Sequence, residues 1–319
     1  MRVLNYAQRS VPIGDIVSRH VNRLDERSRN LALHLADAEA AALDAEPRHV
    51  RAWVAEDQEG ACVGVLLASE KQWEAAHFRC RFEQLSLFRT TATCEPVDSI
   101  SESLVSAWLV ESRPLGGYAT IRVNSRDVDI ARSLETHGFR TLAPTVTLMR
   151  RAPQRREENR RPPPHGFTIG ECTPDDVEQV TTIARDAFIY GRFWNEPRLS
   201  REIAREMHAE WALNCCRKHQ ADEVFVAKRG GEVLGFNAVR VRTYRGVAFG
   251  EINLIAVDQR ARAEGVGRVL VNAGNRWLES RASELMVRTE SPNVAAIRLY
   301  ERCGFLTVDG ALYLGMFLS

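Results

Sequence analysis

Two glycines that follow a strand-like segment mark the first place where this sequence can bind a ligand. They belong to the run Arg262-Ala263-Glu264-Gly265-Val266-Gly267-Arg268. Glycine lets the backbone turn sharply and lets a ligand approach the main chain. A helix that starts here exposes amides without intrahelical partners, which together carry about half a positive charge. The run therefore predicts a cradle for a phosphate or pyrophosphate.

The segments on either side of this turn have the patterns of a strand and a helix. Residues 251–257 are apolar and β-branched, which is typical of a buried strand. Apolar residues recur at spacings of three and four over residues 266–278, which predicts a helix with one apolar face. Two familiar phosphate loops do not fit, because the Lys-Ser/Thr of a Walker loop and the third glycine of a dinucleotide fingerprint are both missing.

A second motif lies downstream, in residues 289–305, and includes Asn293, Tyr300, Gly304 and Phe305. Together with the glycine turn, and in the same order and spacing, it resembles the two-part signature of the GNAT family of N-acetyltransferases. The resemblance implies an α/β fold in which a mixed, mostly antiparallel sheet is flanked by helices. It also implies that acetyl-coenzyme A is the acyl donor.

The resemblance assigns roles to the residues of both motifs. The coenzyme diphosphate is expected at the amides of the turn, and the pantetheine is expected along the strand edge that precedes it. Asn293 is expected to cap its helix and to contact the coenzyme. The expected coenzyme-binding residues are Leu254, Ile255, Ala256, Val257, Arg262, Ala263, Glu264, Gly265, Val266, Gly267, Arg268, Asn293 and Tyr300.

Tyr300 is the candidate general acid. A tyrosine with an ordinary pKa of about 10 is protonated at pH 7 and can serve a leaving thiolate with a pKa of about 8.5. The alternative for Tyr300 is simple core packing. Glu251 is the candidate general base, with a solvated strand-end residue as the alternative, and Asn253 is expected to bind water or substrate.

One further segment narrows the expected acceptor. Residues 188–197, which contain Arg192, Phe193 and Trp194, are similar to the dTDP-fucosamine acetyltransferase group. Members of that group acetylate the amine of a nucleotide-linked amino sugar. Arg192 is suited to a substrate diphosphate, and Phe193 or Trp194 to stacking on a base or sugar. The alternative is that both aromatic residues belong to the core.

The chain divides at residues 151–166, which are polar, charged or small and include three consecutive prolines. Such a segment is an extended linker. It separates residues 1–150 from residues 167–319, and we expect a tandem arrangement of two GNAT-like domains.

The end of the first half repeats the end of the second. With Phe139 placed on Phe305, Leu134 stands where the second half has Tyr300, and Asp127 where it has Asn293. Residues 92–101, where a pyrophosphate turn belongs, contain no glycine. We therefore expect a degenerate GNAT-like domain in residues 1–150 and the catalytic domain in residues 167–319.

Composition sets the remaining expectations. The chain has 319 residues and a net charge of +1, which argues against a nucleic-acid-binding protein. No apolar run is long enough to insert in a membrane, and the histidines lack metal-ligand spacing, so neither a membrane nor a metal is expected. The seven cysteines are expected as reduced thiols in the cytoplasm. Association into a homodimer is left open.

The function expected from these features is acetyl transfer to a primary amine of a small molecule, with a nucleotide-linked amino sugar as one candidate. Two alternatives stay open. One is a tandem acetyltransferase of the mycothiol synthase type. The other is a non-catalytic protein that binds acyl-coenzyme A as a sensor or scaffold.

Overall fold

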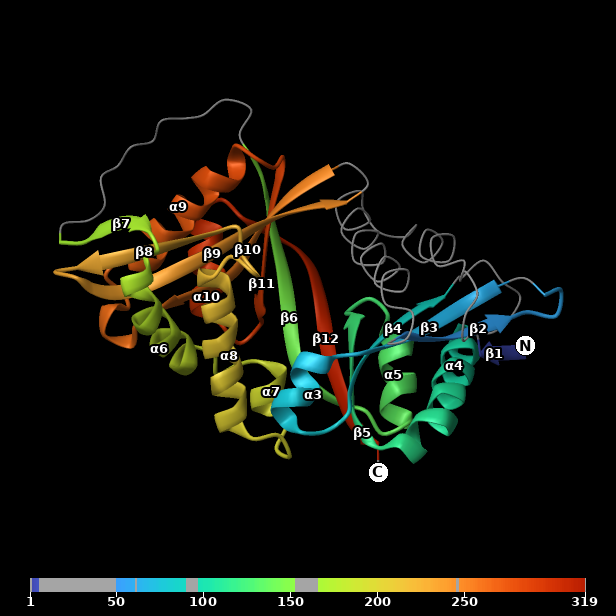
Figure 1. Ribbon diagram of the computed structural model, residues 1–319. Helices are drawn as coiled ribbons and strands as arrows, with labels where there is room; N and C mark the ends of the chain where they lie inside the picture. Colours follow the sequence, from blue (N-terminus) through green and yellow to red (C-terminus); the bar gives the residue numbers. More distant parts are fainter. Residues whose placement is uncertain are drawn as a thin grey trace. The chain divides into compact units, whose positions relative to one another are not determined.

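The computed structural model describes residues 2–5, 50–60, 62–89, 97–152, 166–244 and 247–318. The chain divides into two compact units, Met1–Pro144 with Asp309–Ser319, and Thr145–Val308 (Figure 1). Each combines a mostly antiparallel sheet with flanking helices, as the sequence predicts. Within the described ranges, no helix is long and apolar enough to cross a membrane.

The first unit contains a sheet in the order β1-β2-β3-β4-β5-β12, in which only β4 and β5 run parallel. Its core centres on Trp53, Trp108 and Phe139. The elements are β1 (Arg2–Asn5), β2 (Val50–Glu56), β3 (Cys62–Glu70), α3 (Gln72–Phe78), β4 (Phe82–Arg89), α4 (Val97–Ser112), η2 (Arg113–Leu115), β5 (Gly117–Asn124), α5 (Val128–Thr136) and β12 (Leu306–Leu318).

The second unit contains a sheet in the order β6-β11-β10-β9-β8-β7, in which only β10 and β11 run parallel. Its elements are β6 (Arg140–Arg151), β7 (Thr168–Glu171), η3 (Pro174–Asp176), α6 (Val177–Ala187), α7 (Arg192–Asn195), α8 (Arg201–Cys216), β8 (Glu223–Arg229), β9 (Glu232–Tyr244), β10 (Val247–Val257), η4 (Gln259–Ala261), α9 (Val266–Glu279), β11 (Glu284–Glu290) and α10 (Val294–Arg302).

The two faces of the second sheet are covered by different helices, because side chains of a strand alternate between faces. On β8, Val224 and Val226 pack with α6 and α8. Their neighbours Phe225 and Ala227 pack with the start of α9 on the opposite face. Helices α9 and α10 share this second face and bury Tyr300 between them and the sheet.

The internal repeat is visible as β5-α5-β6 in the first half and β11-α10-β12 in the second. The repeated helices span Val128–Thr136 and Val294–Arg302, the same length in each copy. The last strands are exchanged between the units, since β6 pairs with β11 and β12 pairs with β5.

The predicted domain boundaries follow the sequence repeat, whereas the compact units exchange their last strands. Most of the predicted linker (residues 153–165) and half of the glycine-free segment (residues 92–96) lie outside the described residues. In the first unit Leu134 is fully buried in the core, so an apolar side chain fills the place that Tyr300 holds in the second.

Candidate active site

The glycine turn joins β10 to α9 in the second unit. The short helix η4 follows β10 and is held by Asp258, whose side chain accepts a hydrogen bond from the Arg260 amide at 2.9 Å. The chain then turns through two left-handed residues, Ala263 with φ +67° and Gly265 with φ +88°. Gly265 is the N-cap of α9. The left-handed conformation favours glycine, which has no Cβ penalty there.

The main-chain amides of this turn are free to bind a ligand. The backbone hydrogen bonds of the turn end with the Arg262 amide and resume with that of Val269, which donates to the Gly265 carbonyl at 3.2 Å. Within the described part of the chain, the amides from Ala263 to Arg268 have no backbone acceptor of good geometry. Together with the positive end of α9, they form a site suited to an anion.

Three charged side chains of the turn, Arg262, Glu264 and Arg268, are exposed to solvent. Glu264 forms an ion pair with Arg229. The turn therefore presents two cations and neutralises its own acid.

Gly267, the second residue of α9, has a packing role that the sequence pattern does not reveal. A Cβ atom at this position would lie 3.1 Å from Leu299 Cδ2 and 3.5 Å from Val257 Cγ2. The missing side chain therefore lets the start of α9 approach α10 and the end of β10.

The strand that leads into the turn separates from its parallel neighbour. Pairing between β10 and β11 runs from Phe249 with Glu284 to Ile252 with Val287 and stops there. A β-bulge lies between Ile252 and Leu254 in the pairing with β9. Bulges bend a strand and change which side chains face each side of the sheet.

Residues 254–257 of β10 therefore pair with β9 on one side only. Their other edge lies where the pairing with β11 has ended, and we call this break in the pairing the opening. The four residues that the family resemblance assigns to the pantetheine, Leu254, Ile255, Ala256 and Val257, form this edge.

Tyr300 lies on α10, in the core that also contains Ile252 and Val287, the last residues at which β10 and β11 pair. It is 3% exposed and packs edge-on against Phe305, with ring centroids 6.1 Å apart. Burial raises the pKa of its hydroxyl above the usual value, and the charge of Glu290 raises it further. The hydroxyl is therefore protonated throughout the neutral pH range.

Asn293 caps α10 as predicted. Its side chain accepts a hydrogen bond from the Ala296 amide at 3.3 Å and contacts the Thr289 hydroxyl at 3.4 Å. The cap fixes the start of the helix that carries Tyr300, since an N-cap side chain satisfies an otherwise unpaired amide.

Glu251, predicted as the general base, is held by two arginines. Arg242 donates to one carboxylate oxygen at 2.9 Å and Arg288 to the other at 3.3 Å. The Glu251 side chain is only 12% exposed. Its assignment as a base stays a prediction that these contacts do not favour, because both oxygens already accept charge-assisted hydrogen bonds.

Asn253 occupies the bulge in β10. Its amide donates to the Gln220 carbonyl at 2.7 Å and contacts Cys215 Sγ at 3.6 Å. The side chain thus ties the bulge to the loop after α8. Its assignment as a substrate-binding residue also stays a prediction. The structure shows Asn253 holding the bulge in place through these contacts.

The segment Arg192, Phe193 and Trp194 forms helix α7. Phe193 is 9% exposed, and the Arg192 guanidinium lies over its ring at 4.3 Å from the centroid. This burial favours the core alternative for Phe193. Trp194 is half-buried, with the Arg201 guanidinium 5.2 Å from the centroid of its ring.

A comparison with protein families finds one that matches this unit. Residues 179–305 match the model of the acetyltransferase (GNAT) family. They form a GNAT acetyltransferase domain. The matched range contains the glycine turn, the separated strands, Asn293 and Tyr300.

Curated relatives fall into two groups. The spore coat polysaccharide biosynthesis protein SpsD of Bacillus subtilis is 25% identical over 251 residues, which cover 78% of this chain and 82% of SpsD. The mycothiol acetyltransferase of Thermobispora bispora is 34% identical over 111 residues. That match covers 31% of this chain and 38% of the relative, so it spans less than half of the mycothiol enzyme.

Solved structures share the fold along the whole chain. A GCN5-related N-acetyltransferase from Sphaerobacter thermophilus has a TM-score of 0.64 at 12% identity, covering 99% of this chain and 96% of its own. A tandem GNAT protein from the clavulanic acid biosynthesis pathway has a TM-score of 0.63 at 12% identity, covering 100% and 99%. The tandem architecture is therefore shared with known GNAT proteins.

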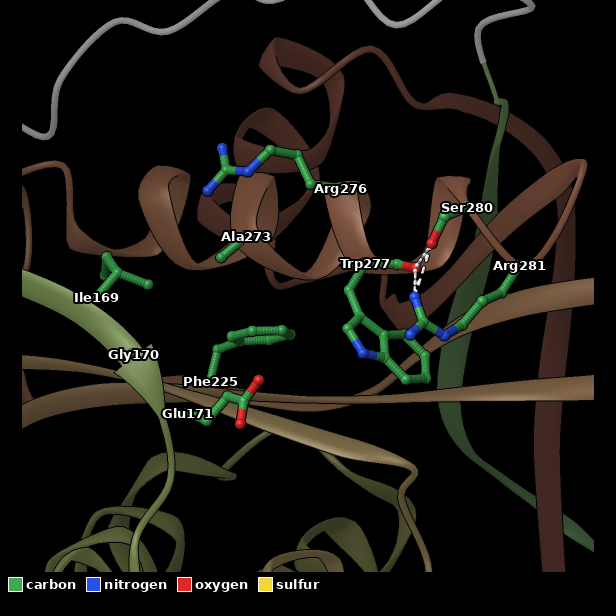
Figure 2. A pocket seen from close by; sticks show the side chains of 9 residues that line it. All are labelled: Ile169, Gly170, Glu171, Phe225, Ala273, Arg276, Trp277, Ser280 and Arg281. Carbon is green, nitrogen blue, oxygen red and sulfur yellow. Dashed lines mark hydrogen bonds between the residues drawn. The ribbon is translucent and has the colours of Figure 1, made fainter.

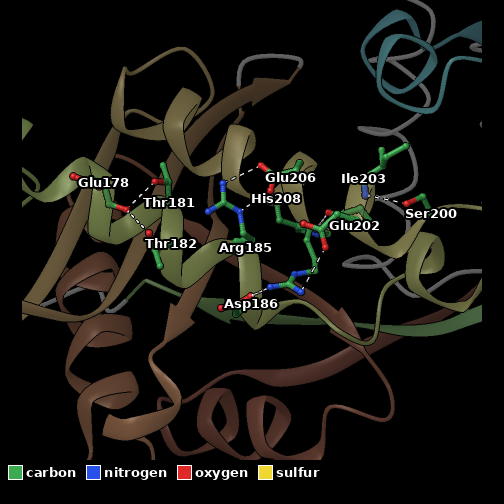
Figure 3. Close-up of polar contacts among 12 residues, drawn as sticks. Glu178, Thr181, Thr182, Arg185, Asp186, Ser200, Glu202, Ile203, Glu206 and His208 are labelled. Carbon is green, nitrogen blue, oxygen red and sulfur yellow. Dashed lines mark hydrogen bonds and ion pairs between the residues drawn. The ribbon is translucent and has the colours of Figure 1, made fainter.

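In the GNAT domain, α6 and α8 are joined by ion pairs (Figure 3). Arg185 binds both carboxylate oxygens of Glu206, at 2.7 and 2.9 Å, and Arg205 pairs with Asp186. The Ser200 side chain caps α8. These contacts hold α6 and α8 together, and the segment that contains α7 connects the two helices along the chain.

A shallow pocket of about 650 Å³ lies elsewhere on the GNAT domain, between β7 and the second half of α9 (Figure 2). Arg281 partly fills it, since its guanidinium lies over the Trp277 ring and donates to the Trp277 carbonyl at 2.8 Å. Its lining contains none of the predicted site residues. The pocket is therefore separate from the candidate active site.

The structure adds Glu290 to the site, a residue of the second motif that sequence reasoning left without a role. A Cβ atom placed on Gly191 would lie 3.6 Å from Glu290 Oε1, so the carboxylate rests against the chain before α7. An acid at the end of a strand, three residues before the helix cap Asn293, was the signal available in the sequence.

Proposed function

We propose that this protein transfers an acetyl group from acetyl-coenzyme A to a primary amine of a small molecule. One observation carries the proposal. The unpaired amides of the glycine turn continue into a strand edge that no longer pairs with β11, and Tyr300 lies in the core that contains the last paired residues, Ile252 and Val287. This arrangement suits a long ligand with a diphosphate at one end and a reactive thioester at the other.

The chain's own groups fit the coenzyme along its length. The amides from Ala263 to Arg268 would hold the diphosphate, with Arg262 and Arg268 beside it. The free edge of residues 254–257 would bind the pantetheine amides as an added strand does. The bound coenzyme supplies an activated acetyl thioester.

Tyr300 acts at the leaving sulfur in this proposal. Its raised pKa keeps the proton on the hydroxyl at neutral pH, so this proton is available to the thiolate as coenzyme A departs. The packing against Phe305 holds the ring in one orientation, which is what a positioned acid requires. An intact tyrosine, cap and turn also argue against a purely coenzyme-sensing role.

The acceptor we favour is a nucleotide-linked amino sugar. The match to SpsD, a polysaccharide biosynthesis protein, extends over both halves of the chain, whereas the match to mycothiol acetyltransferases covers less than half of those proteins. The resemblance of residues 188–197 to dTDP-fucosamine acetyltransferases points the same way. A mycothiol-type acceptor is the second candidate, supported by the higher identity of the shorter match.

The test begins with binding of coenzyme A to the wild-type protein by calorimetry. Labelled acetyl-coenzyme A is then supplied with separate pools of nucleotide amino sugars, simple amino sugars and cysteinyl amines, and acetylated product is identified by mass. Acetylation of a nucleotide amino sugar is the expected result. Absence of coenzyme binding would refute the proposed function.

A further inference from the structure

We propose that the Glu290 carboxylate receives the acceptor amine, binds it as an ammonium ion and takes its proton. This inference rests on the proposed function, because it assigns a residue to the acceptor side of the same reaction. It adds a base that the sequence motif alone does not assign.

The position of Glu290 is the first argument. β11 leaves β10 after Val287 but stays paired with β6 up to Glu290, which lies opposite Thr145. Glu290 is thus the last residue of β11, beyond the point where the two parallel strands separate. The reacting end of a ligand bound along β10 would lie in this opening.

The surroundings of the carboxylate are the second argument. It is half-buried and lies against Gly191, the residue before α7. A Cβ atom on Gly191 would lie in ordinary contact with Glu290 Oε1, 3.6 Å away, so the carboxylate is next to the loop that leads into α7. Because Glu290 is only half-buried, part of its side chain is accessible to a small cationic group.

Its charge is the third argument. Among the residues that the structure describes, no arginine, lysine or histidine forms an ion pair with Glu290. Two other acids of the domain do have such partners, Glu251 with two arginines and Glu264 with one. A half-buried carboxylate without a cation is stabilised by binding one. A primary amine is protonated at pH 7 and supplies that cation.

The chemistry follows from this pairing. The bound ammonium gives one proton to Glu290, which releases it to solvent, and the nitrogen lone pair forms a bond to the thioester carbonyl carbon. The carbon–sulfur bond then breaks, and the sulfur takes the Tyr300 proton. The second proton of the nitrogen restores Tyr300. The products are the amide, free thiol and one proton.

The test compares Glu290→Gln with the wild type and with Glu301→Gln, a control that removes an equal charge from an exposed site on α10. The probes are glucosamine and a nucleotide-linked amino sugar, each with acetyl-coenzyme A. We expect Glu290→Gln to lower kcat/KM by about 10²–10⁴-fold, the scale of a positioned base. Coenzyme affinity should stay unchanged.

A binding measurement completes the test without turnover. In the presence of coenzyme A, Glu290→Gln should bind the probe amines at least about tenfold more weakly than Glu301→Gln does. Equal amine affinity, or a kcat/KM within threefold of wild type, would overturn the role of Glu290. If the wild type does not bind coenzyme A, the proposed function itself would be overturned.

Discussion

Replacement of Gly267 by valine tests how the coenzyme turn is held in place. The missing Cβ points at Leu299 Cδ2, 3.1 Å away, and at Val257 Cγ2, 3.5 Å away. Gly267→Ala requires a shift of only a few tenths of an ångström in the flexible end of Leu299. Valine adds two further methyl groups to a contact that is already tight.

Overpacking of this kind costs about 1–3 kcal/mol. We therefore expect Gly267→Val to lower the Tm by about 2–4 °C per kcal/mol. It should also weaken coenzyme A binding, because the start of α9 must move away from α10 and carries its amides with it. The expected loss is about tenfold or more, the scale of weakening one hydrogen bond to a charged group.

The matched experiment is a double-mutant cycle with Leu299→Ala, which opens the space that valine needs. Thermal denaturation and coenzyme calorimetry are measured for Gly267→Val, Leu299→Ala and the double variant. We expect the double variant to be more stable than the sum of the two single changes predicts, by about 1 kcal/mol. Additive effects within about 0.5 kcal/mol would refute the packing role of Gly267.

Other side chains give independent tests. Tyr300→Phe should lower kcat by about 10²–10⁴-fold with little change in coenzyme affinity. Burial raises the pKa of Tyr300, so its hydroxyl resists ionisation in the folded protein. The free energy of unfolding of the wild type should therefore stay constant up to about pH 10 and fall at higher pH, and it should fall less in Tyr300→Phe. An equal pH dependence in the two proteins would contradict the burial argument. Glu251→Gln should lower the free energy of unfolding by about 1–2 kcal/mol in urea, since it weakens two ion pairs; an unchanged midpoint would show that they contribute nothing. Cys172 and Cys216, with sulfur atoms 3.7 Å apart, should form a disulfide under oxidised glutathione, seen as a cross-linked peptide that Cys172→Ser abolishes.

The sequence predicts the elements of the second unit well because each has a local signal. Thr173 and Pro174 indicate a helix start, and Thr173 indeed forms a capping box with Asp176. The glycine turn and the helix after it also follow from pattern and spacing. Each of these features depends on residues close together in the chain, so a single window of sequence contains the information.

Features that depend on distant partners could not be predicted in this way. The residues around Asn253 give no local signal for a bulge. The Asn253 side chain is held instead by the loop after α8, whose Gln220 carbonyl accepts its hydrogen bond. The sequence around Glu251 suggests an available base, because the two arginines that pair with it, Arg242 and Arg288, come from two other strands. Glu290 received no role because its environment is made by Gly191, far away in sequence.

The exchanged strand explains why a half without the chemical residues still matters to the GNAT unit. β6 comes from the first repeat, yet it pairs with β11 along the whole of that strand and buries Leu148 in the core that contains Tyr300. Its Arg150 donates to the Cys303 carbonyl at the end of α10, at 3.1 Å, and pairs with Glu279 at the end of α9, at 2.7 Å. One side chain thus links the helix of the coenzyme turn to the helix of the proposed acid. The first repeat has lost the tyrosine, but its last strand helps to hold the two helices that the proposed reaction needs.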